Sequence, residues 1–178
     1  MYRIAALALL LVAMIAPPAY SQGKDTLRLE TTKGNIVIRL RRDLAPGHAD
    51  RLLTLAREKF YDNVPFHRVI DGFMAQTGDG QRGDGTGGSK YPDLKAEFSK
   101  VPFTRGVVGM ARKGNSNDSA NSQFFIMFGE AASLNGQYTV IGEVLSGMGV
   151  VDKLKKGSQA QNGSVTDPDR IVRATPGS

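Results

Sequence analysis

The segment Val64–Asp79, VPFHRVIDGFMAQTGD, combines one arginine with closely spaced apolar side chains and leads into a glycine-rich loop. Alternation along a strand predicts that Phe66, Arg68 and Ile70 share one face. The same alternation turns His67 away from Arg68. A guanidinium stays charged in proteins, so an arginine on an apolar face indicates that a ligand meets it there. An arginine whose stem covers the core and whose head reaches water would give the same pattern, and both interpretations stay open here.

The first 21 residues have the pattern of a secretory signal peptide. Arg3 is followed by the unbroken apolar run Ile4–Ala16, and Ala19 and Ser21 are the small residues of a cleavage site. The run is shorter than the roughly 20 residues that span a bilayer, so we expect cleavage and no stable membrane anchor. The mature protein would then be exported, to the periplasm of a two-membrane bacterium or to the medium of a single-membrane one.

The remaining segment, 22–178, has the length of one domain and is long enough to bury a core. The whole chain has a formal net charge of +6 and contains no cysteine, which excludes disulfides, thiolate metal ligands and a cysteine nucleophile. Its densest basic cluster is Arg39, Arg41 and Arg42, at the end of a predicted strand, which is typical of a solvated face. We therefore expect no nucleic-acid partner, and a monomer.

The glycine-rich segment Gly78–Tyr91 nearly matches two nucleotide-binding motifs. The spacing Gly83-x-Gly85-x-x-Gly88 fits the dinucleotide fingerprint, but Pro92 is a poor start for the helix that must follow. The order Ser89-Lys90 is the reverse of the one that a phosphate loop needs. We expect a mobile loop that lets backbone pass close to a ligand, without a cofactor or a metal.

A second informative stretch is Asn121–Phe128, NSQFFIMF. Alternation places Gln123, Phe125 and Met127 on one side, and the residues between them on the other. An apolar strand with both faces filled has core on one side and a further covering on the other. A helix could supply that covering, but the single glutamine favours a ligand.

Pattern along the rest of the chain predicts about eight short strands and two helices. Residues 26–40 have the alternation of a hairpin that turns at 33–35, and Pro46 opens a helix. Mostly tight turns join the strands, which favours an all-β fold, a closed eight-stranded antiparallel barrel with two helical caps. The other predicted elements are strands at 64–70, 73–77, 105–112, 121–128, 138–145 and 170–174, and a helix at 148–156.

Four motifs together resemble the cyclophilins, a family of peptidyl-prolyl cis-trans isomerases. They are FHRVI-x-GFM-x-Q at 66–76, GDGTGG at 83–88, SQFFI at 122–126 and LNGQYTVIGEV at 134–144. The resemblance covers Thr26 to Ala174, and the leader and the loop before Gln123 are similar to exported bacterial members. Ser133 and Tyr138 depart from the Trp and His that many members have, and Thr77 replaces a glycine.

This resemblance implies the fold predicted above and a site on the outer wall of the barrel. It implies that Arg68 is the catalytic cation, acting with Phe73 and Gln76. The residues that we expect to bind substrate are Phe66, Met74, Ala111, Arg112, Gln123, Phe125, Leu134 and Tyr138.

The implied reaction is rotation about X–Pro bonds in exported proteins, without a covalent intermediate. Arg68 would donate a hydrogen bond to the prolyl nitrogen when rotation frees its lone pair. Two other functions remain open: a chaperone that binds proline-containing segments without turning them over, and an envelope scaffold that uses the arginines at 39–42.

Overall fold

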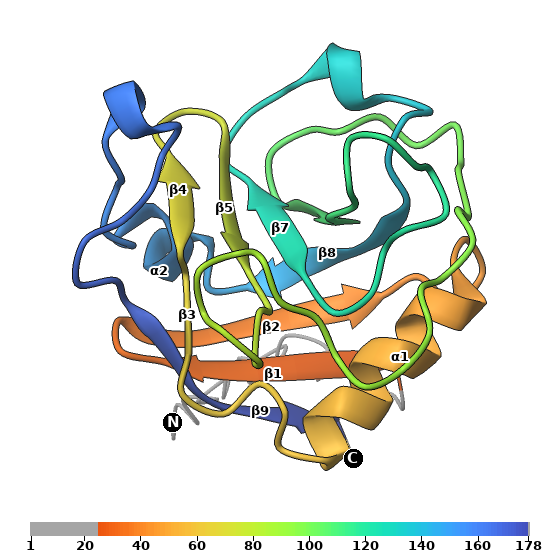
Figure 1. Ribbon diagram of the computed structural model, residues 1–178, viewed down its shortest axis with the longest axis horizontal. Coiled ribbons are helices and arrows are strands. Elements are labelled where there is room, and N and C mark those ends of the chain that lie inside the picture. Colours follow the sequence, from red (N-terminus) through yellow and green to blue (C-terminus); the bar gives the residue numbers. More distant parts are fainter. Residues whose placement is uncertain (1–24, 178) are drawn as a thin grey trace, which may run out of the picture.

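Nine strands form one antiparallel sheet in the computed structural model, which describes residues 25–177 (Figure 1). Their order across the sheet is β3-β9-β1-β2-β8-β6-β7-β5-β4. The predicted leader, 1–21, lies outside the described residues. The strands are β1 Thr26–Thr31, β2 Gly34–Leu40, β3 Val64–Pro65, β4 Arg68–Ile70, β5 Met74–Thr77, β6 Val107–Met110, β7 Phe124–Met127, β8 Val140–Ser146 and β9 Arg170–Pro176.

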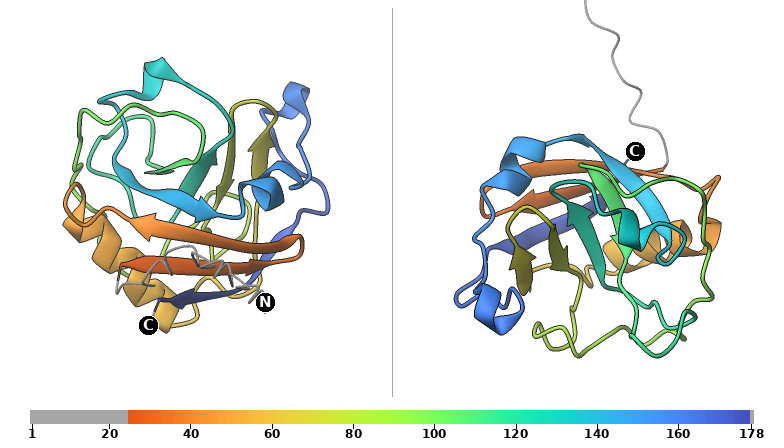
Figure 2. Two further views of the ribbon diagram at one scale, coloured as in Figure 1. Left: turned by 180° about the vertical axis from the view of Figure 1, so that it is seen from behind. Right: turned by 90° about the horizontal axis from the view of Figure 1, so that it is seen from above.

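The predicted mostly-β fold with two helices is confirmed, but the sheet is a curled half-barrel of nine strands rather than a clearly closed barrel of eight, and the predicted strand at 64–70 is two strands. Phe66 and Val69 both lie in the main core cluster, and two residues three positions apart cannot share one face of a regular strand. The chain therefore leaves the extended pattern at Phe66 and His67, between β3 and β4. Within residues 25–177 no ladder of hydrogen bonds joins β3 to β4, so the sheet is curled rather than closed (Figure 2).

Two helices pack against the curled sheet. The first, α1 (Pro46–Arg57), begins at the predicted proline and buries its apolar face. Glu97 accepts hydrogen bonds from the backbone N–H groups of Gly47 and His48, and so satisfies donors at the start of this helix. The second, α2 (Met148–Asp152), is shorter than predicted. Within residues 25–177, neither helix is long and apolar enough to cross a membrane.

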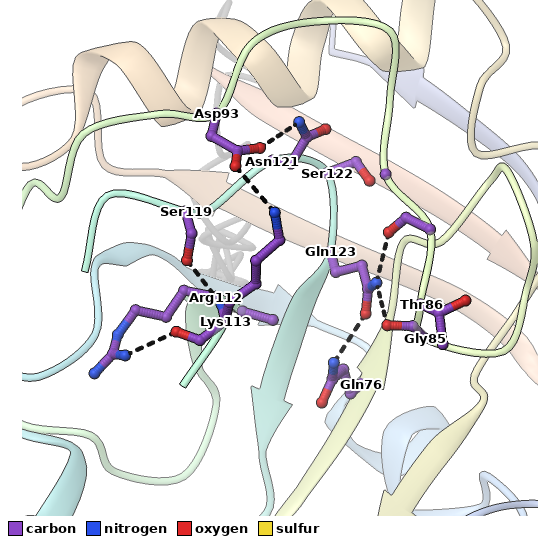
Figure 3. A pocket seen from close by; sticks show the side chains of 13 residues that line it. Gln76, Gly85, Thr86, Asp93, Arg112, Lys113, Ser119, Asn121, Ser122 and Gln123 are labelled. Carbon is purple, nitrogen blue, oxygen red and sulfur yellow. Dashed lines mark hydrogen bonds and ion pairs between the residues drawn. The ribbon is translucent and has the colours of Figure 1, made fainter. Parts of the chain in front are cut away.

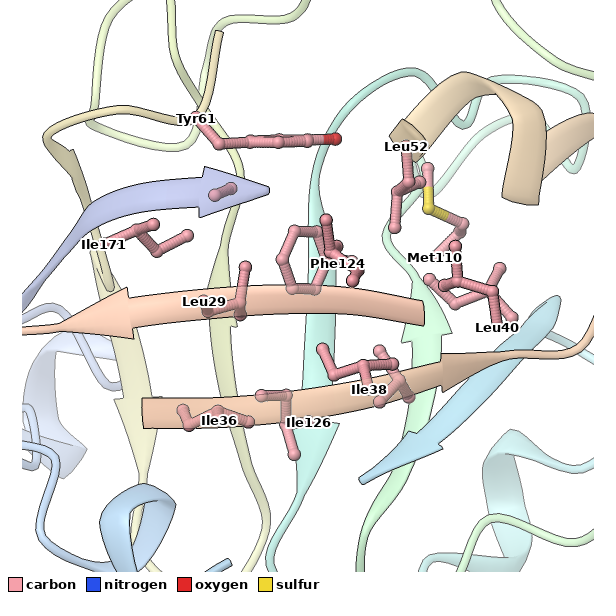
Figure 4. Close-up of a cluster of buried hydrophobic side chains, with 14 of the residues drawn as sticks. Leu29, Ile36, Ile38, Leu40, Leu52, Tyr61, Met110, Phe124, Ile126 and Ile171 are labelled. Atoms are coloured by element: carbon pink, nitrogen blue, oxygen red, sulfur yellow. The ribbon is translucent and has the colours of Figure 1, made fainter. Parts of the chain in front are cut away.

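The strand β7 separates two clusters of buried side chains, as the alternation of Asn121–Phe128 predicted. Phe124 and Ile126 lie in the main core between the curled sheet and α1, beside Leu29 and Ile38 (Figure 4). The opposite face of β7 contributes to a smaller cluster, which forms the base of the site described below. Its buried members are Met74, Phe103, Val107, Phe125, Met127 and Val140.

Gly109 on β6 gives the smaller cluster room for two stacked rings. Phe103 and Phe125 lie with ring centroids 5.7 Å apart. A Cβ at Gly109 would lie 2.5 Å from Cζ of Phe125 and 2.6 Å from Cε1 of Phe103. The absence of a side chain at this position is therefore required for the packing of Phe125.

We predict that Gly109→Ala lowers the free energy of unfolding by about 1–3 kcal/mol, the usual effect of overpacking a core. The matched control is Gly114→Ala, because a Cβ there meets no atom within 4 Å. Chemical denaturation of the two variants and the parent measures both effects. Equal stability of the two variants would contradict this account of the packing.

Candidate active site

Strand register brings the predicted site residues of three strands into one row. Arg68 on β4 lies opposite Gln76 on β5, and Gln76 lies opposite Phe125 on β7. These strands are adjacent at one end of the sheet (Figure 1). Because directly opposed residues point to the same face, the cation, the amide and the aromatic ring meet on one surface.

A pocket of about 120 Å³ opens on this surface. Phe125 is its buried aromatic wall, and Tyr138 meets that ring edge to face with centroids 5.8 Å apart. The guanidinium of Arg112 covers Tyr138 at 4.6 Å from the ring centroid. The pocket is lined by nine residues that the sequence predicted: Arg68, Phe73, Met74, Gln76, Ala111, Arg112, Phe125, Leu134 and Tyr138.

The half-buried Arg68 enters this pocket with its guanidinium held by neutral oxygens. Its Nη1 donates to Oε1 of Gln76 at 3.3 Å. Its Nε donates to the backbone oxygen of Asn162 at 2.9 Å, and its Nη2 to Oδ1 of the same residue at 3.0 Å. Burial lowers the pKa of Arg68 below its ordinary value, yet a guanidinium remains charged in proteins. Within residues 25–177, the pocket therefore holds an oriented cation that no carboxylate neutralises.

A larger cavity of about 410 Å³ adjoins the pocket and shares its Gln76, Ala111 and Arg112 (Figure 3). Gln76 donates from Nε2 to Oε1 of Gln123 at 2.9 Å. Gln123 in turn donates from Nε2 to the backbone oxygens of Gly85 and Gly87, each at 2.9 Å. The glycine-rich loop therefore orients both amides that line the larger cavity, and through Gln76 it reaches the pocket.

Asp79 organises that loop, which was expected to be mobile. Its buried carboxylate accepts hydrogen bonds from the backbone N–H groups of Arg82, Gly85 and Gly87 at 2.9–3.0 Å. Burial acts to raise the pKa of Asp79, but these donors outweigh it and leave the pKa below its ordinary value. The loop is therefore a hydrogen-bonded structure in which backbone passes close to the cavity.

Comparison with protein-family profiles matches residues 26–176 to the family described as cyclophilin type peptidyl-prolyl cis-trans isomerase/CLD. The chain belongs to this family. It is 52% identical to a probable peptidyl-prolyl cis-trans isomerase of Brucella suis, over 96% of this chain and 92% of the relative. It is 41% identical to a peptidyl-prolyl cis-trans isomerase of Helicobacter pylori, over 72% of this chain and 79% of the relative.

Solved cyclophilins have the same fold. The chain resembles a cyclophilin from Hirschia baltica with a TM-score of 0.76 and 27% identity, over 85% of this chain and 73% of that one. It also resembles a Cryptosporidium parvum cyclophilin crystallised in the presence of the dipeptide Ala-Pro. That likeness has a TM-score of 0.77 and 25% identity, and covers 86% of this chain and 99% of the other.

Phe66 is a predicted substrate-binding residue that lies in the core and not in the pocket. It is completely buried in the main core and does not line the pocket, so the prediction that it contacts substrate is wrong. The kink between β3 and β4 is the reason, because it ends the alternation that would have put Phe66 beside Arg68. Gln123, the remaining predicted residue, lines the adjoining cavity rather than the pocket.

His67 lies under the glycine-rich loop, where a Cβ on Gly85 would be 2.8 Å from its Nε2. Neither ring nitrogen has a hydrogen-bond partner in the described chain. Burial lowers the pKa of His67, so the ring is neutral near pH 7. Its assignment as a structural residue remains a prediction.

Asn162 is the residue at this site that the sequence analysis missed. It lies 94 positions from Arg68 and was part of no motif that pattern could connect to the cation. The sequence feature that marks this position is the dipeptide Asn162-Gly163, which is typical of turns with positive φ. That signal predicts a turn but does not reveal what the turn contacts.

We predict that Asp79→Asn lowers the free energy of unfolding at pH 7 by about 1–3 kcal/mol, because backbone donors lose a charged acceptor. The native pKa of Asp79 is lowered. The stability that its ionised form contributes is therefore complete above the unfolded-state pKa of about 4 and is lost as pH falls through the native pKa.

The difference between variant and parent should consequently narrow below about pH 4. Denaturation curves between pH 3 and pH 7 test this, with Asp71→Asn as the control at an exposed carboxylate. A destabilisation that is the same at every pH would contradict the role assigned to the charge.

Proposed function

We propose that this cyclophilin accelerates cis-trans rotation of X–Pro bonds without a covalent intermediate, and that Arg68 donates a hydrogen bond to the prolyl nitrogen. The observation that carries the proposal is a guanidinium that has no carboxylate partner within residues 25–177 and lies beside the apolar side chains of Phe73, Met74, Phe125 and Leu134 in one pocket. The isomerase names of the relatives and the Ala-Pro dipeptide of a structural neighbour support proline-containing polypeptides as its substrates.

The barrier to this reaction arises from sharing of the nitrogen lone pair with the carbonyl, and it is about 18–20 kcal/mol. Rotation localises the lone pair on nitrogen, which then becomes a hydrogen-bond acceptor. A donor that meets it stabilises the twisted amide more than either planar form, and this difference is what accelerates a reaction. Arg68 needs no proton transfer for this role, so its permanent charge suits it.

The apolar side chains of the pocket support the same mechanism. Phe125, Met74 and Leu134 can hold a pyrrolidine ring and exclude water from the amide. A twisted amide has a weaker dipole than a planar one, so an apolar environment favours it. Exclusion of water also strengthens the interaction between the guanidinium and the nitrogen.

The chaperone that binds without catalysis would use this same pocket. It requires apolar contacts but has no need of an oriented donor, and the three hydrogen bonds on Arg68 favour the enzyme. Rotation of a short X–Pro peptide distinguishes the two, because a pure binder leaves the rate unchanged.

The scaffold hypothesis depended on Arg39, Arg41 and Arg42 as free cations. Each of these arginines forms an ion pair with a carboxylate of the same chain. The pairs are Arg39 with Glu143, Arg41 with Asp43, and Arg42 with both Asp25 and Asp50. These carboxylates reduce the positive field that an acidic partner would meet, so we favour this function least.

We predict that Arg68→Ala lowers kcat/KM for a short X–Pro peptide by about a hundredfold or more, the typical effect of removing one preorganised donor. Arg68→Lys should lose much of the activity as well, because an ammonium lacks the planar fork that Asn162 and Gln76 hold. Cis-to-trans relaxation of the peptide is the measurement. Near-normal turnover by a folded Arg68→Ala variant would remove Arg68 from the mechanism.

We also propose that residues 1–21 direct export and that the mature enzyme, 22–178, acts on exported polypeptides. The support is the sequence pattern of a charged start, a short apolar run and a small-residue cleavage site. Expression in a two-membrane bacterium, followed by fractionation and N-terminal sequencing, should find the enzyme in the periplasm with a new N-terminus after Ser21 or Ala19. An intact N-terminus in the cytosol would contradict export.

A further inference from the structure

Asn162 supplies two of the three acceptors that hold the Arg68 guanidinium in the described chain. Its backbone oxygen is 2.9 Å from Nε, and its Oδ1 is 3.0 Å from Nη2. From this geometry we infer that Asn162 is a positioning residue for the reaction, which fixes the plane of the guanidinium and leaves its charge intact. The inference rests on the proposed function, because it has a meaning only if Arg68 acts on the substrate.

The backbone of Asn162 has a conformation that asparagine tolerates better than most residues. It follows the short 3₁₀ helix η2 (Gln159–Gln161), with φ at 54°, and Gly163 continues with φ at 80°. The turn is closed by a hydrogen bond of 2.8 Å from the N–H of Gly163 to the oxygen of Ser158. This closed turn places one backbone oxygen and one side-chain oxygen on the same guanidinium.

The turn is attached to the chain on both sides of Arg68. The N–H of Val69 donates to the oxygen of Gly163 at 2.8 Å, and the N–H of Val165 donates to the oxygen of His67 at 3.1 Å. Gly163 also packs directly on the strand, because a Cβ there would lie 2.4 Å from Cγ1 of Ile70. The acceptors of Asn162 are therefore fixed relative to the backbone that carries the cation.

This arrangement determines which donors of Arg68 remain for the substrate. A guanidinium has five N–H groups. Asn162 engages Nε and one N–H of Nη2, and Gln76 engages one N–H of Nη1. One N–H on each terminal nitrogen remains for a substrate in the pocket, and the plane in which both lie is fixed before the substrate binds. Such preorganisation avoids an entropic cost at the transition state.

The neutrality of the acceptors matters as much as their position. A carboxylate would hold the guanidinium in a bidentate ion pair and compensate its charge before the amide twists. The backbone oxygen and the amide oxygen of Asn162 orient the guanidinium without compensating its charge. An exchange of the amide for a carboxylate therefore tests the charge, and removal of the side chain tests the position.

The charge arm uses Asn162→Asp, with Gln161→Glu as a control that adds the same charge one residue away on an exposed position. At pH 7 we expect kcat/KM of Asn162→Asp to be lowered about tenfold, the effect of altering one hydrogen bond to a charged group. Activity should recover as the pH falls through the pKa of the new carboxyl, which Arg68 holds below about 3.9. Gln161→Glu should stay near the parent activity and show no recovery in acid.

The position arm uses Asn162→Gly, which keeps the positive φ and removes Oδ1. We expect kcat to fall several-fold, on the scale of one lost hydrogen bond, with KM nearly unchanged. The decisive comparison is the double-mutant cycle: in the Arg68→Ala background, neither Asn162 variant should lower the residual rate further. Tm, measured for every variant, separates these effects from loss of the fold.

Four results decide the inference. It is overturned if the Asn162 variants keep parental kcat, or if they lower the rate by the same factor with and without Arg68. A folded Arg68→Ala with normal turnover instead overturns the proposed function, and the inference with it. If Asn162→Asp does not fold, the cycle with Asn162→Gly decides alone. A rate loss that disappears in the Arg68→Ala background, with acid recovery in Asn162→Asp, establishes the positioning role.

Discussion

The interaction on which this site depends is the set of neutral hydrogen bonds to the Arg68 guanidinium. A buried or half-buried cation in a protein is usually paired with a carboxylate, since desolvation of an unpaired charge is costly. Here two amide oxygens and one backbone oxygen satisfy the group, and burial lowers its pKa. Within residues 25–177 no carboxylate pairs with this guanidinium, so in the proposed mechanism a full positive charge at the edge of the pocket would meet the prolyl nitrogen.

The interruption between β3 and β4 provides the geometry for this arrangement. It sends Phe66 into the core while Arg68 stays in register with Gln76 and Phe125. On both sides of Arg68 the backbone is hydrogen-bonded to the segment 163–165, from the N–H of Val69 to Gly163 and from the N–H of Val165 to His67. On the other side, Asp79 fixes the glycine-rich loop, and the loop fixes Gln123 and Gln76. Two loops from distant parts of the chain thus converge on one cation.

Much of the fold could be predicted from the sequence, because it depends on the periodic spacing of apolar residues within single strands and helices. The hairpin at 26–40, the helix that opens at Pro46 and a two-sided strand within 121–128 follow from alternation and helical spacing. All three are confirmed, although the strand is limited to Phe124–Met127. Motif resemblance then supplied nine residues that line the pocket. The position of Phe66 was wrong because alternation assumes a regular strand and cannot detect where tertiary packing interrupts it. The closed barrel was predicted from strand number and tight turns, which do not determine whether the edge strands β3 and β4 pair. Asn162 was missed because its contact joins residues 94 positions apart.

The most direct test of the account separates catalysis from binding on the same peptide. Exchange spectroscopy by NMR can measure both the affinity for an X–Pro peptide and its cis-trans interconversion rate on the protein, for the parent and for Arg68→Ala. The account predicts an on-enzyme rate about a hundredfold lower in the variant, with little change in Kd, because the donor acts on the twisted amide. A variant that loses affinity and rate in equal measure would contradict it, since Arg68 would then contribute to binding rather than to rotation.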